Sequence, residues 1–321
     1  MCIGIIIINY RTPQLVIDCL SSLEQEVEIG RDRVVVVDNC SGDNSLELIT
    51  EAVKQNQWNN WVTIVPSPVN GGFSAGNNVG IKAVDAQAYL LLNSDTIVRP
   101  GAIATLYEVM EKYPEAGLIS PRLEWPDETP QISCFRNHSP ISELINSAAT
   151  GFITKMLKSF DVPIPVSDEP FEPDWTSFAC VLIRREVIEQ IGLMDEGYFM
   201  YYDDVDYCRM ARNAGWQVVH YPKARVVHLR GGSGSLKADV AARKRPPAYR
   251  YESRSRYFAK FYGYSGLWIA NLFWLIGRSV SLVREWVGNK KPHTCKLQAR
   301  DIWTNWRNPM KPSLILRSKP E

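Results

Sequence analysis

The stretch "IGIIIINY", residues 3–10, is an almost unbroken run of β-branched residues. Such a run predicts a strand covered on both faces, because a half-exposed strand alternates with polar residues. The next segment, 13–23, carries apolar residues at helical spacing, and "RVVVVDN", 33–39, repeats the buried-strand pattern and ends near Asp38. The start of the chain therefore predicts a strand, a helix and a second buried strand.

The same alternation continues along the first 121 residues. Further helices are predicted at 45–54, 74–84 and 101–113, and further strands at 61–68, 88–95 and 116–121. Repeated alternation with short connections predicts an α/β fold with a mainly parallel sheet. Ligands of such sheets bind beyond the carboxyl ends of the strands, so we expect the polar strand ends to share one crevice: Asn9 to Arg11, Asp38 and Asn39, Asn70 to Gly72, and Asn93 to Asp95.

The rest of the chain is less regular. From about 122 to 174 prolines are frequent and periodicity is weak, which indicates a long excursion or a lid. Order returns with the predicted strand "FACVLI", the helices "REVIEQIG" and "DVDYCRMARNAGW", and the short strands "QVVHY" and "ARVVHL". Residues 246–287 are predicted to be mostly helical.

Composition narrows the functional classes. A formal net charge of +1 over 321 residues gives no reason to expect nucleic acid or another highly charged partner. The seven cysteines are scattered without a C-x-x-C pair, and no secretory signal pattern opens the sequence, which fits a reducing cytosol and disfavours zinc. The longest apolar stretch, 267–277, is too short to span a bilayer. We therefore expect a cytoplasmic protein.

Several strand ends carry residues that suit either a turn or a ligand. Asp95 follows the buried run at 88–92, so its carboxylate must be hydrated, paired or bound to a cation, although a lone "NSD" is more often a turn. Glycines in "NGGFSAGNN", 70–78, let the backbone approach an anion or simply make the turn. Asp38 could contact a base or ribose, or cap a helix. No one of these motifs decides its function alone.

The segment "YFMYYDDVDYCRM", 198–210, places Asp203, Asp204 and Asp206 directly after an aromatic run. Clustered carboxylates beside aromatic rings have raised pKa values, which suits a general base or a cation site. The alternative is a negatively charged first helical turn that is stabilised by the helix dipole.

His228 ends a predicted strand and is followed by "LRGGSGS" and a basic tract up to Arg256. A histidine in such a place is ordinarily structural, and a basic run is ordinarily a solvated face. Gly- and Ser-rich loops flanked by arginines also close over phosphates.

Together these segments resemble the family-2 glycosyltransferases of the GT-A fold, particularly the bacterial rhamnosyltransferase-like branch. The matching segments are "IIIINYRTP", "VVVVDNCSGDNS", "NGGFSAGNN", "LLLNSD", "GLMDEGYFMYYDDVDYCRMARNAGW" and "VVHLRGGSGS", in the family's order over about residues 1–235. The resemblance implies a Rossmann-like, mainly parallel sheet sandwiched by helices, with a C-terminal helical extension. It also implies a nucleotide-diphospho-sugar donor and a divalent cation, Mg²⁺ or Mn²⁺.

The resemblance implies a donor site built from the strand ends. Asp95 matches the metal ligand of the family's D-x-D motif, in which Asn93 replaces the first acid, and His228 matches a further metal or diphosphate contact. Asp38 would recognise the pyrimidine base. The other residues expected to bind the nucleotide-sugar are Asn9, Tyr10, Arg11, Asn70, Gly71, Gly72, Asn77, Ser94, Arg230 and Ser233.

The "DDVD" segment corresponds to the family's acidic motif. Its second acid, Asp204, would be the catalytic base, while Asp203 stands where the family more often has Glu and would help to position the acceptor. Asp206 completes the motif. One base opposite the leaving group gives in-line displacement and therefore inversion, and the departing diphosphate needs a cation or arginines to offset its charge.

The resemblance favours L-rhamnose from dTDP-rhamnose as the transferred sugar and a growing polysaccharide or lipid-linked glycan as the acceptor. A UDP-hexose transferase of the same fold, a nucleotidyltransferase and a non-catalytic nucleotide-sugar-binding module remain alternatives.

We expect a GT-A domain over 1–235, with a nucleotide-binding half (1–121) and an acceptor and catalytic half (122–235). A basic loop and helical extension over 236–321 would follow. This extension prompts two hypotheses: peripheral contact with the inner face of the cell membrane, or packing on the domain or in a homodimer.

Overall fold

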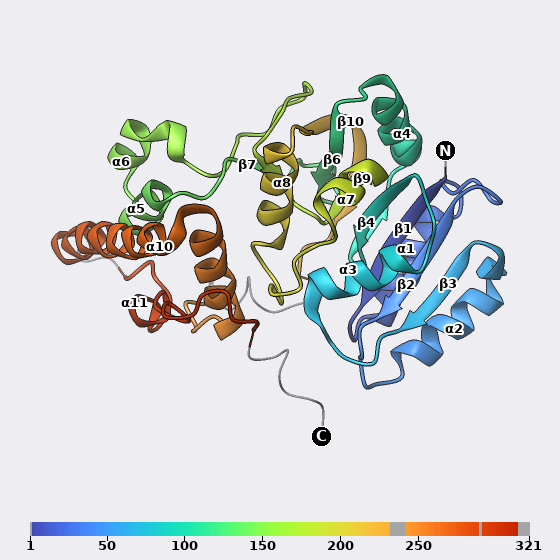
Figure 1. Ribbon diagram of the computed structural model, residues 1–321, viewed down its shortest axis with the longest axis horizontal. Coiled ribbons are helices and arrows are strands. Elements are labelled where there is room, and N and C mark those ends of the chain that lie inside the picture. The colour runs from blue at the N-terminus through green and yellow to red at the C-terminus, as the bar shows by residue number, and fades with distance from the viewer. Residues whose placement is uncertain (1, 232–241, 289–290, 314–321) are drawn as a thin grey trace.

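The computed structural model describes residues 2–231, 242–288 and 291–313. Its centre is an eight-stranded sheet with the order β3-β2-β1-β4-β9-β6-β10-β5 (Figure 1). The strands are β1 (Ile3–Asn9), β2 (Arg33–Asp38), β3 (Val62–Pro66), β4 (Ala88–Asn93), β5 (Thr96–Val98), β6 (Ala116–Glu124), β9 (Cys180–Arg184) and β10 (Gln217–His228). The prediction of an α/β fold is confirmed.

Strands β1 to β4 form the parallel half of the sheet. β1 lies between β2 and β4, and β3 pairs with the outer edge of β2. The register joins Asn9 to Asp38 and Ile8 to Asn93. The polar residues that end three of these strands therefore lie at one edge of the sheet, as the sequence predicts.

The other half of the sheet is mixed. β9 runs antiparallel to both β4 and β6, while β10 runs parallel to β6 and antiparallel to β5. The segments predicted as two short strands, "QVVHY" and "ARVVHL", form one strand, because a register shift between Tyr221 and Arg225 absorbs the proline that lies between them.

Helices cover both faces of the sheet. The helices with sides against it are α1 (Pro13–Leu23), α2 (Ser45–Gln55), α3 (Gly72–Lys82), α4 (Ala102–Lys112), α7 (Arg185–Ile191) and α8 (Asp203–Asn213). Alternate residues of β1 enter two cores: Ile5 packs in the core that includes α1, α2 and α4, and Ile6 packs in the core that includes α3, α7 and α8. This two-sided burial explains why the central strands are uniformly apolar.

Residues 122–174 carry short elements of their own: β7 (Cys134–Phe135), α5 (Pro140–Ala148), α6 (Gly151–Met156) and the 3₁₀ turn Lys158–Phe160. β7 pairs with β8 (Trp175–Thr176). The predicted excursion is therefore partly helical. Ser139 caps α5 through a reciprocal hydrogen-bonded box with Ser142, which fixes the helix start.

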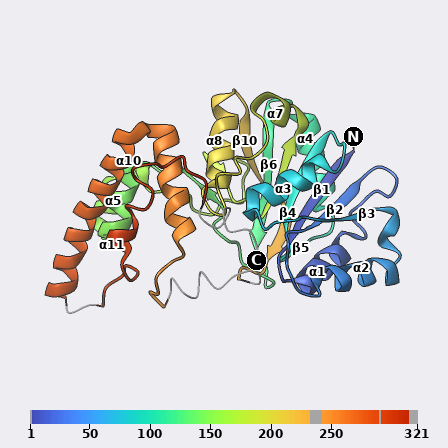
Figure 2. The same cartoon turned by 60° about the horizontal axis from the view of Figure 1, so that its bottom comes forward.

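The long helix α10 (Ala248–Val287) follows, with α11 (Gln298–Asp301) after it. α10 is broken at Gly263, which has a φ of 70°, and its two parts run in different directions (Figures 1 and 2). The second part lies beside α5, with Gly277 against Leu144 and Ala148, and Arg254 of the first part pairs with Glu143 of α5 at 2.8 Å. In the described ranges α10 alone is long and apolar enough to cross a membrane, by length and composition only, with a mean hydropathy of 1.4 over its best window. The helix extends beyond the apolar stretch 267–277, which by itself is too short to span a bilayer.

Candidate active site

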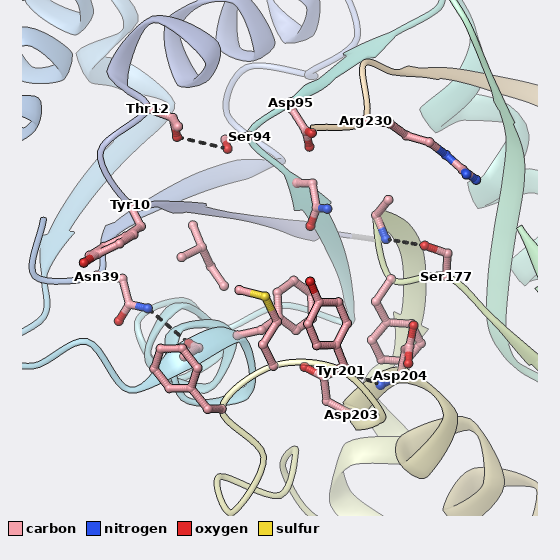
Figure 3. A pocket seen from close by; sticks show the side chains of 18 of the residues that line it. Tyr10, Thr12, Asn39, Ser94, Asp95, Ser177, Tyr201, Asp203, Asp204 and Arg230 are labelled. Atoms are coloured by element: carbon pink, nitrogen blue, oxygen red, sulfur yellow. Dashed lines mark hydrogen bonds between the residues drawn. The ribbon is translucent and has the colours of Figure 1, made fainter. Parts of the chain in front are cut away.

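A cavity of about 600 Å³ opens beyond the carboxyl ends of the parallel strands (Figure 3). This size suits a ligand as large as a sugar nucleotide. Its lining residues come from the strand ends, from the loops before β9 and α8, and from the start of α10: Ile8, Tyr10, Thr12, Asn39, Asn70, Gly72, Phe73, Asn93, Ser94, Asp95, Ser177, Phe178, Ala179, Phe199, Met200, Tyr201, Asp203, Asp204, His228, Arg230, Gly231 and Tyr249.

Asp95 and His228 meet on one side of this cavity because β5 and β10 pair there. Thr96 faces His228 across the two strands, and the amide of Leu229 donates to the Asp95 carbonyl at 2.9 Å. This pairing places His228 Nε2 3.5 Å from Asp95 Oδ1. Asp95 is 1% exposed, and neither its Oδ1 nor His228 Nδ1 has a hydrogen-bond partner.

A buried carboxylate oxygen without a hydrogen bond, next to an imidazole, fits a divalent cation. Within the described ranges, no three His, Cys, Asp or Glu side chains cluster closely enough to hold a metal ion. Two protein ligands are nevertheless a common number for Mg²⁺, which takes its remaining oxygens from water and substrate phosphates.

Asp203 and Asp204 open α8 on the opposite side of the cavity from Asp95 (Figure 3). The Asp204 carboxylate accepts the Val205 amide at 2.9 Å, and Asp203 Oδ2 is buried without a partner. Burial raises the pKa of both carboxyls, and the charge of Asp203 raises the pKa of Asp204 further. The two acids therefore hold a proton more readily than ordinary aspartates.

The loop before these acids is strained. Tyr201 and Tyr202 have φ values of 69° and 65°, and Arg11 and Arg230 beside the cavity have 59° and 44°. Left-handed backbone costs such residues about 1–3 kcal/mol each, and residues of this kind concentrate at binding and catalytic sites. The two tyrosines turn the chain so that α8 begins at the acidic pair.

Asp206 lies behind the site and does not line the cavity. It accepts hydrogen bonds from Lys260 Nζ at 2.7 Å and from the Tyr198 hydroxyl at 2.9 Å. Burial raises its pKa, although Lys260 opposes this shift. Asp206 therefore ties α8 to the first part of α10.

The glycine loop that begins at Asn70 makes hydrogen bonds within the protein. The amide of Phe73 donates to the Phe199 carbonyl at 2.8 Å, and the Gly72 amide donates to Asn70 Oδ1 at 3.1 Å. Gly72 has a φ of 82°, and a side chain there would collide with the Phe199 backbone. Gly72 thus admits the loop that carries the acidic pair, which agrees with the turn that the sequence left open, and anion binding by this loop stays a prediction.

Asp38 is engaged beneath the cavity. Its Oδ1 accepts from Asn9 Nδ2 at 2.7 Å and from the Ser41 hydroxyl at 2.6 Å, while its Oδ2 accepts the Ser41 amide at 3.2 Å. Arg11 Nε donates to the Ser41 carbonyl at 2.8 Å. These contacts shape the turn after β2, and Asp38 does not cap α2, whose N-cap residue is Asn44. Contact of Asp38 with a base stays a prediction.

The structure thus brings most of the predicted site residues together. The predicted residues that line the cavity are Tyr10, Asn70, Gly72, Asn93, Ser94, Asp95, Asp203, Asp204, His228 and Arg230. Those that do not line it are Asn9, Arg11, Asp38, Gly71, Asn77 and Asp206. Asn77 is buried in α3 and donates to the Phe73 carbonyl at 3.0 Å. Ser233 falls outside the described residues.

Sequence reasoning missed the aromatic wall of the cavity. Tyr201 and Tyr249 stack with ring centroids 6.1 Å apart, and Phe199 lies 5.2 Å from Tyr249. The run "YFMYY" was a visible signal, because the aromatic residues directly precede the acids. Tyr249 opens the segment "YRYESRSRYFAKFYG", which also resembles the rhamnosyltransferase-like branch but does not place this side chain in the cavity.

The family model described as "Glycosyl transferase family 2" matches residues 4–192, which include the sheet edge and the Asp95 turn. The chain belongs to glycosyl transferase family 2. This membership displaces nucleotidyl transfer as an alternative. The acidic pair and His228 lie beyond the matched residues, so their roles rest on the geometry and on the resemblance of their motifs.

Relatives of this family 2 glycosyltransferase place it in the rhamnosyltransferase-like branch. It is 28% identical over 265 residues to an N-acetylglucosaminyl-diphospho-decaprenol L-rhamnosyltransferase of Mycobacterium tuberculosis, which covers 78% of this chain and 81% of the relative. It is 23% identical to the dTDP-rhamnosyl transferase RfbF of Shigella flexneri, over 72% of this chain and 71% of the relative.

The fold of this glycosyltransferase is GT-A. The mannosyltransferase PcManGT of Pyrobaculum calidifontis, solved in complex with GDP-Man and Mn2+, superposes with a TM-score of 0.57 at 14% identity. The match covers 91% of this chain and 76% of the mannosyltransferase. The predicted GT-A fold class is confirmed.

Proposed function

We propose that this family 2 glycosyltransferase is an inverting enzyme that moves a sugar from a nucleotide-diphospho-sugar to a glycan hydroxyl. One observation carries the proposal: a single cavity has Asp95 and His228 on one side and the acidic pair Asp203 and Asp204 on the other. Inverting transfer needs these two functions, stabilisation of a leaving diphosphate and a base for the incoming hydroxyl, on opposite sides of the reacting carbon.

Asp95 and His228 would hold Mg²⁺ or Mn²⁺ at the donor side. The partnerless Asp95 oxygen supports this assignment, and the solved mannosyltransferase in the same fold is a complex with Mn2+. When bound, such a cation offsets the negative charge that grows on the departing diphosphate. Arg230 lies on the same side of the cavity, where its Nη2 donates to the Ile132 carbonyl at 2.7 Å, and it would add a positive charge on the donor side (Figure 3).

Asp204 is the proposed base. Its carboxylate accepts the proton of the acceptor hydroxyl as the acceptor oxygen bonds to C1 of the sugar and the bond from C1 to the phosphate oxygen breaks. Burial and the charge of Asp203 raise the pKa of Asp204, which makes its carboxylate a stronger base than that of an ordinary aspartate. Asp203 would help to position the acceptor.

The aromatic wall formed by Phe199, Tyr201 and Tyr249 supports an acceptor glycan on the Asp204 side. Aromatic faces pack against apolar C–H faces, while the tyrosine hydroxyls can hydrogen-bond to polar groups. An acceptor sugar stacked there would present its hydroxyl to the base.

Two relatives are named as rhamnosyltransferases, one of them for dTDP-rhamnose, which supports dTDP-L-rhamnose as the donor. One relative is named for a diphospho-decaprenol acceptor, which supports a lipid-linked glycan or growing cell-envelope polysaccharide. A UDP-hexose is the second candidate donor, because a relative of Haloferax volcanii is named as a hexosyltransferase.

A thermal-shift screen of nucleotide-sugars with Mn²⁺ tests the donor, because a ligand that binds the folded state raises the Tm. We expect dTDP-rhamnose to raise the Tm more than dTDP alone, UDP-glucose or GDP-mannose. Preference for a UDP-sugar would overturn the rhamnose assignment, and no shift with any nucleotide-sugar would count against the donor site itself. Transfer of rhamnose with an inverted anomeric configuration, read by NMR, tests the stereochemistry.

A further inference from the structure

The second part of α10, residues 264–287, covers α5 with one face and leaves the other face open. Its buried residues recur every three or four positions, and Gly277 lets the backbone of α5 approach closely. The opposite face is lined by large apolar side chains that lack cover. Leu272 is 53% exposed, Val283 is 62% exposed and Trp286 is 85% exposed. We call this surface the open face of α10. Its other exposed members are Tyr264, Ile269, Ile276, Val280, Leu282 and Val287, while Trp268 at its edge packs against Trp303 and Trp306.

The open face carries no charge along its length. Residues 264–287 contain three charged side chains, and all three turn toward the protein. Arg278 pairs with the buried Glu285 at 2.8 Å, and Arg284 donates to the Ala149 carbonyl. At 1.5 Å per residue the face is about 36 Å long. A monomeric protein rarely leaves so long an apolar strip in water.

Charge is divided unevenly along the chain. Residues 236–321 contain 18 Lys and Arg but only 5 Asp and Glu, a net charge of +13. The preceding 235 residues hold the other 18 basic and 30 acidic residues, a net charge of −12. The overall charge of +1 therefore hides a strongly basic region that includes the open face.

We propose that the open face of α10 lies in the surface of an anionic lipid bilayer. An apolar strip on a basic segment matches a negatively charged interface, whereas a second copy docked by the same face would bring two basic segments together. The segment stays basic although Arg254, Arg256 and Lys260 pair with Glu143, Asp195 and Asp206 outside it. The helix lies along the bilayer and does not cross it. Its other face is packed on α5 and includes Asn271, which is buried and accepts a hydrogen bond from Arg254 Nη1 at 2.7 Å.

This inference depends on neither the donor nor the acceptor, so vesicle binding tests it separately from the proposed function. The full chain is mixed with sucrose-loaded vesicles of phosphatidylcholine alone or with phosphatidylglycerol, at low and high salt, and sedimented. The chain has ten tryptophans, so the blue shift that Trp286 contributes on leaving water is taken as the difference between the wild type and Trp286→Phe.

The test variant is Leu272→Asp with Val283→Asp, which puts two carboxylates on the open face. The matched control is Ile29→Asp with Val69→Asp, which adds the same charge at similarly exposed positions away from α10. Circular dichroism confirms that both variants fold. We expect the wild type and the control to bind the anionic vesicles at low salt, with the test variant weakened about tenfold or more.

Three outcomes would overturn the proposal. The first is a wild type that stays in solution with anionic vesicles at low salt, and the second is a test variant that binds as well as the control. The third is a wild-type dimer in light scattering that the test variant dissociates, because a second copy would then cover the open face.

Discussion

Asp204 meets the cavity from the first turn of α8, and its proton affinity decides whether it can act as a base. Asp204→Asn keeps the size of the side chain and removes the proton acceptor. We expect turnover to fall by about 10²- to 10⁴-fold with little change in donor affinity. Transfer rates and calorimetric titration of the donor measure the two effects. Asp127→Asn, in an exposed turn, is the control, and near-normal turnover in Asp204→Asn would show that another group is the base.

Asp95 is buried with a free carboxylate oxygen that faces His228. Asp95→Ala should weaken nucleotide binding by about tenfold or more in Mg²⁺ or Mn²⁺, because a cation that bridges protein and diphosphate loses a ligand. In EDTA the same substitution should change little. Fluorescence titration with dTDP measures the affinity in both conditions. If Asp95→Ala loses the same affinity with the metal ion and with EDTA, Asp95 has no metal role.

At the residue scale, sequence reasoning located the site but could not assign every role. Asp95 and Asp204 line the cavity as expected, whereas Asp38 and Asp206 resemble them in sequence and lie behind it. The difference comes from their hydrogen-bond partners. Asn9 and Ser41 donate to the Asp38 carboxylate, and Lys260 donates to the Asp206 carboxylate. Lys260 is 54 residues away from Asp206, so no local pattern could reveal the pairing.

At the element scale, α8 is held in place by the first part of α10. Lys260 pairs with Asp206 on α8 and lies 3.6 Å from Asp195, and Arg256 binds Asp195 at 2.8 Å. Because Asp206 is almost wholly buried, the loss of Lys260 leaves a carboxylate that only the Tyr198 hydroxyl and distant charges can stabilise. The start of α8, and with it Asp204, therefore depends on α10.

Lys260→Met tests this dependence. We expect a loss of about 2 kcal/mol in the free energy of unfolding, discounted for the partial exposure of Lys260, and a lower kcat. Lys260→Arg should restore most of both, since it keeps the charge. The double variant Lys260→Met with Asp206→Asn should be more stable than Lys260→Met alone. Urea denaturation measures the free energy of unfolding. If Lys260→Met unfolds with the same free energy as the wild type, Lys260 does not hold α8 in place.

Strong periodicity made most elements predictable, and tertiary contacts explain the rest. The strands of the parallel half were predicted because burial on both faces leaves them apolar throughout. β10 was predicted as two strands because Pro222 interrupts the pattern, and only its pairing with β6 shows that a bulge carries the strand through. The contribution of Tyr249 to the cavity depends on how α10 returns to the sheet, which sequence periodicity does not record.

At the scale of the whole molecule, the acidic pair lowers the stability of the fold when it is ionised. Burial raises the folded-state pKa of Asp203 above its unfolded value, so its stabilising contribution is present below the unfolded pKa and is lost as pH rises through the folded pKa. Asp203→Asn should therefore raise the Tm relative to the wild type at neutral and alkaline pH, by an amount equivalent to about 2 kcal/mol, with a smaller difference in acid. Thermal melts across pH test this expectation, with Glu51→Gln, on the exposed side of α2, as the control. A difference that shrinks as pH rises would contradict it.

The left-handed residues Arg11, Tyr201, Tyr202 and Arg230 have a consequence for directed evolution. Glycine adopts that backbone without steric cost, so a library screened only for heat resistance would favour glycine there. The selected glycine variants would lose the side chains that border the cavity. Screens of this enzyme must therefore score turnover in every round, because around this cavity the most heat-resistant backbone and the active one call for different residues.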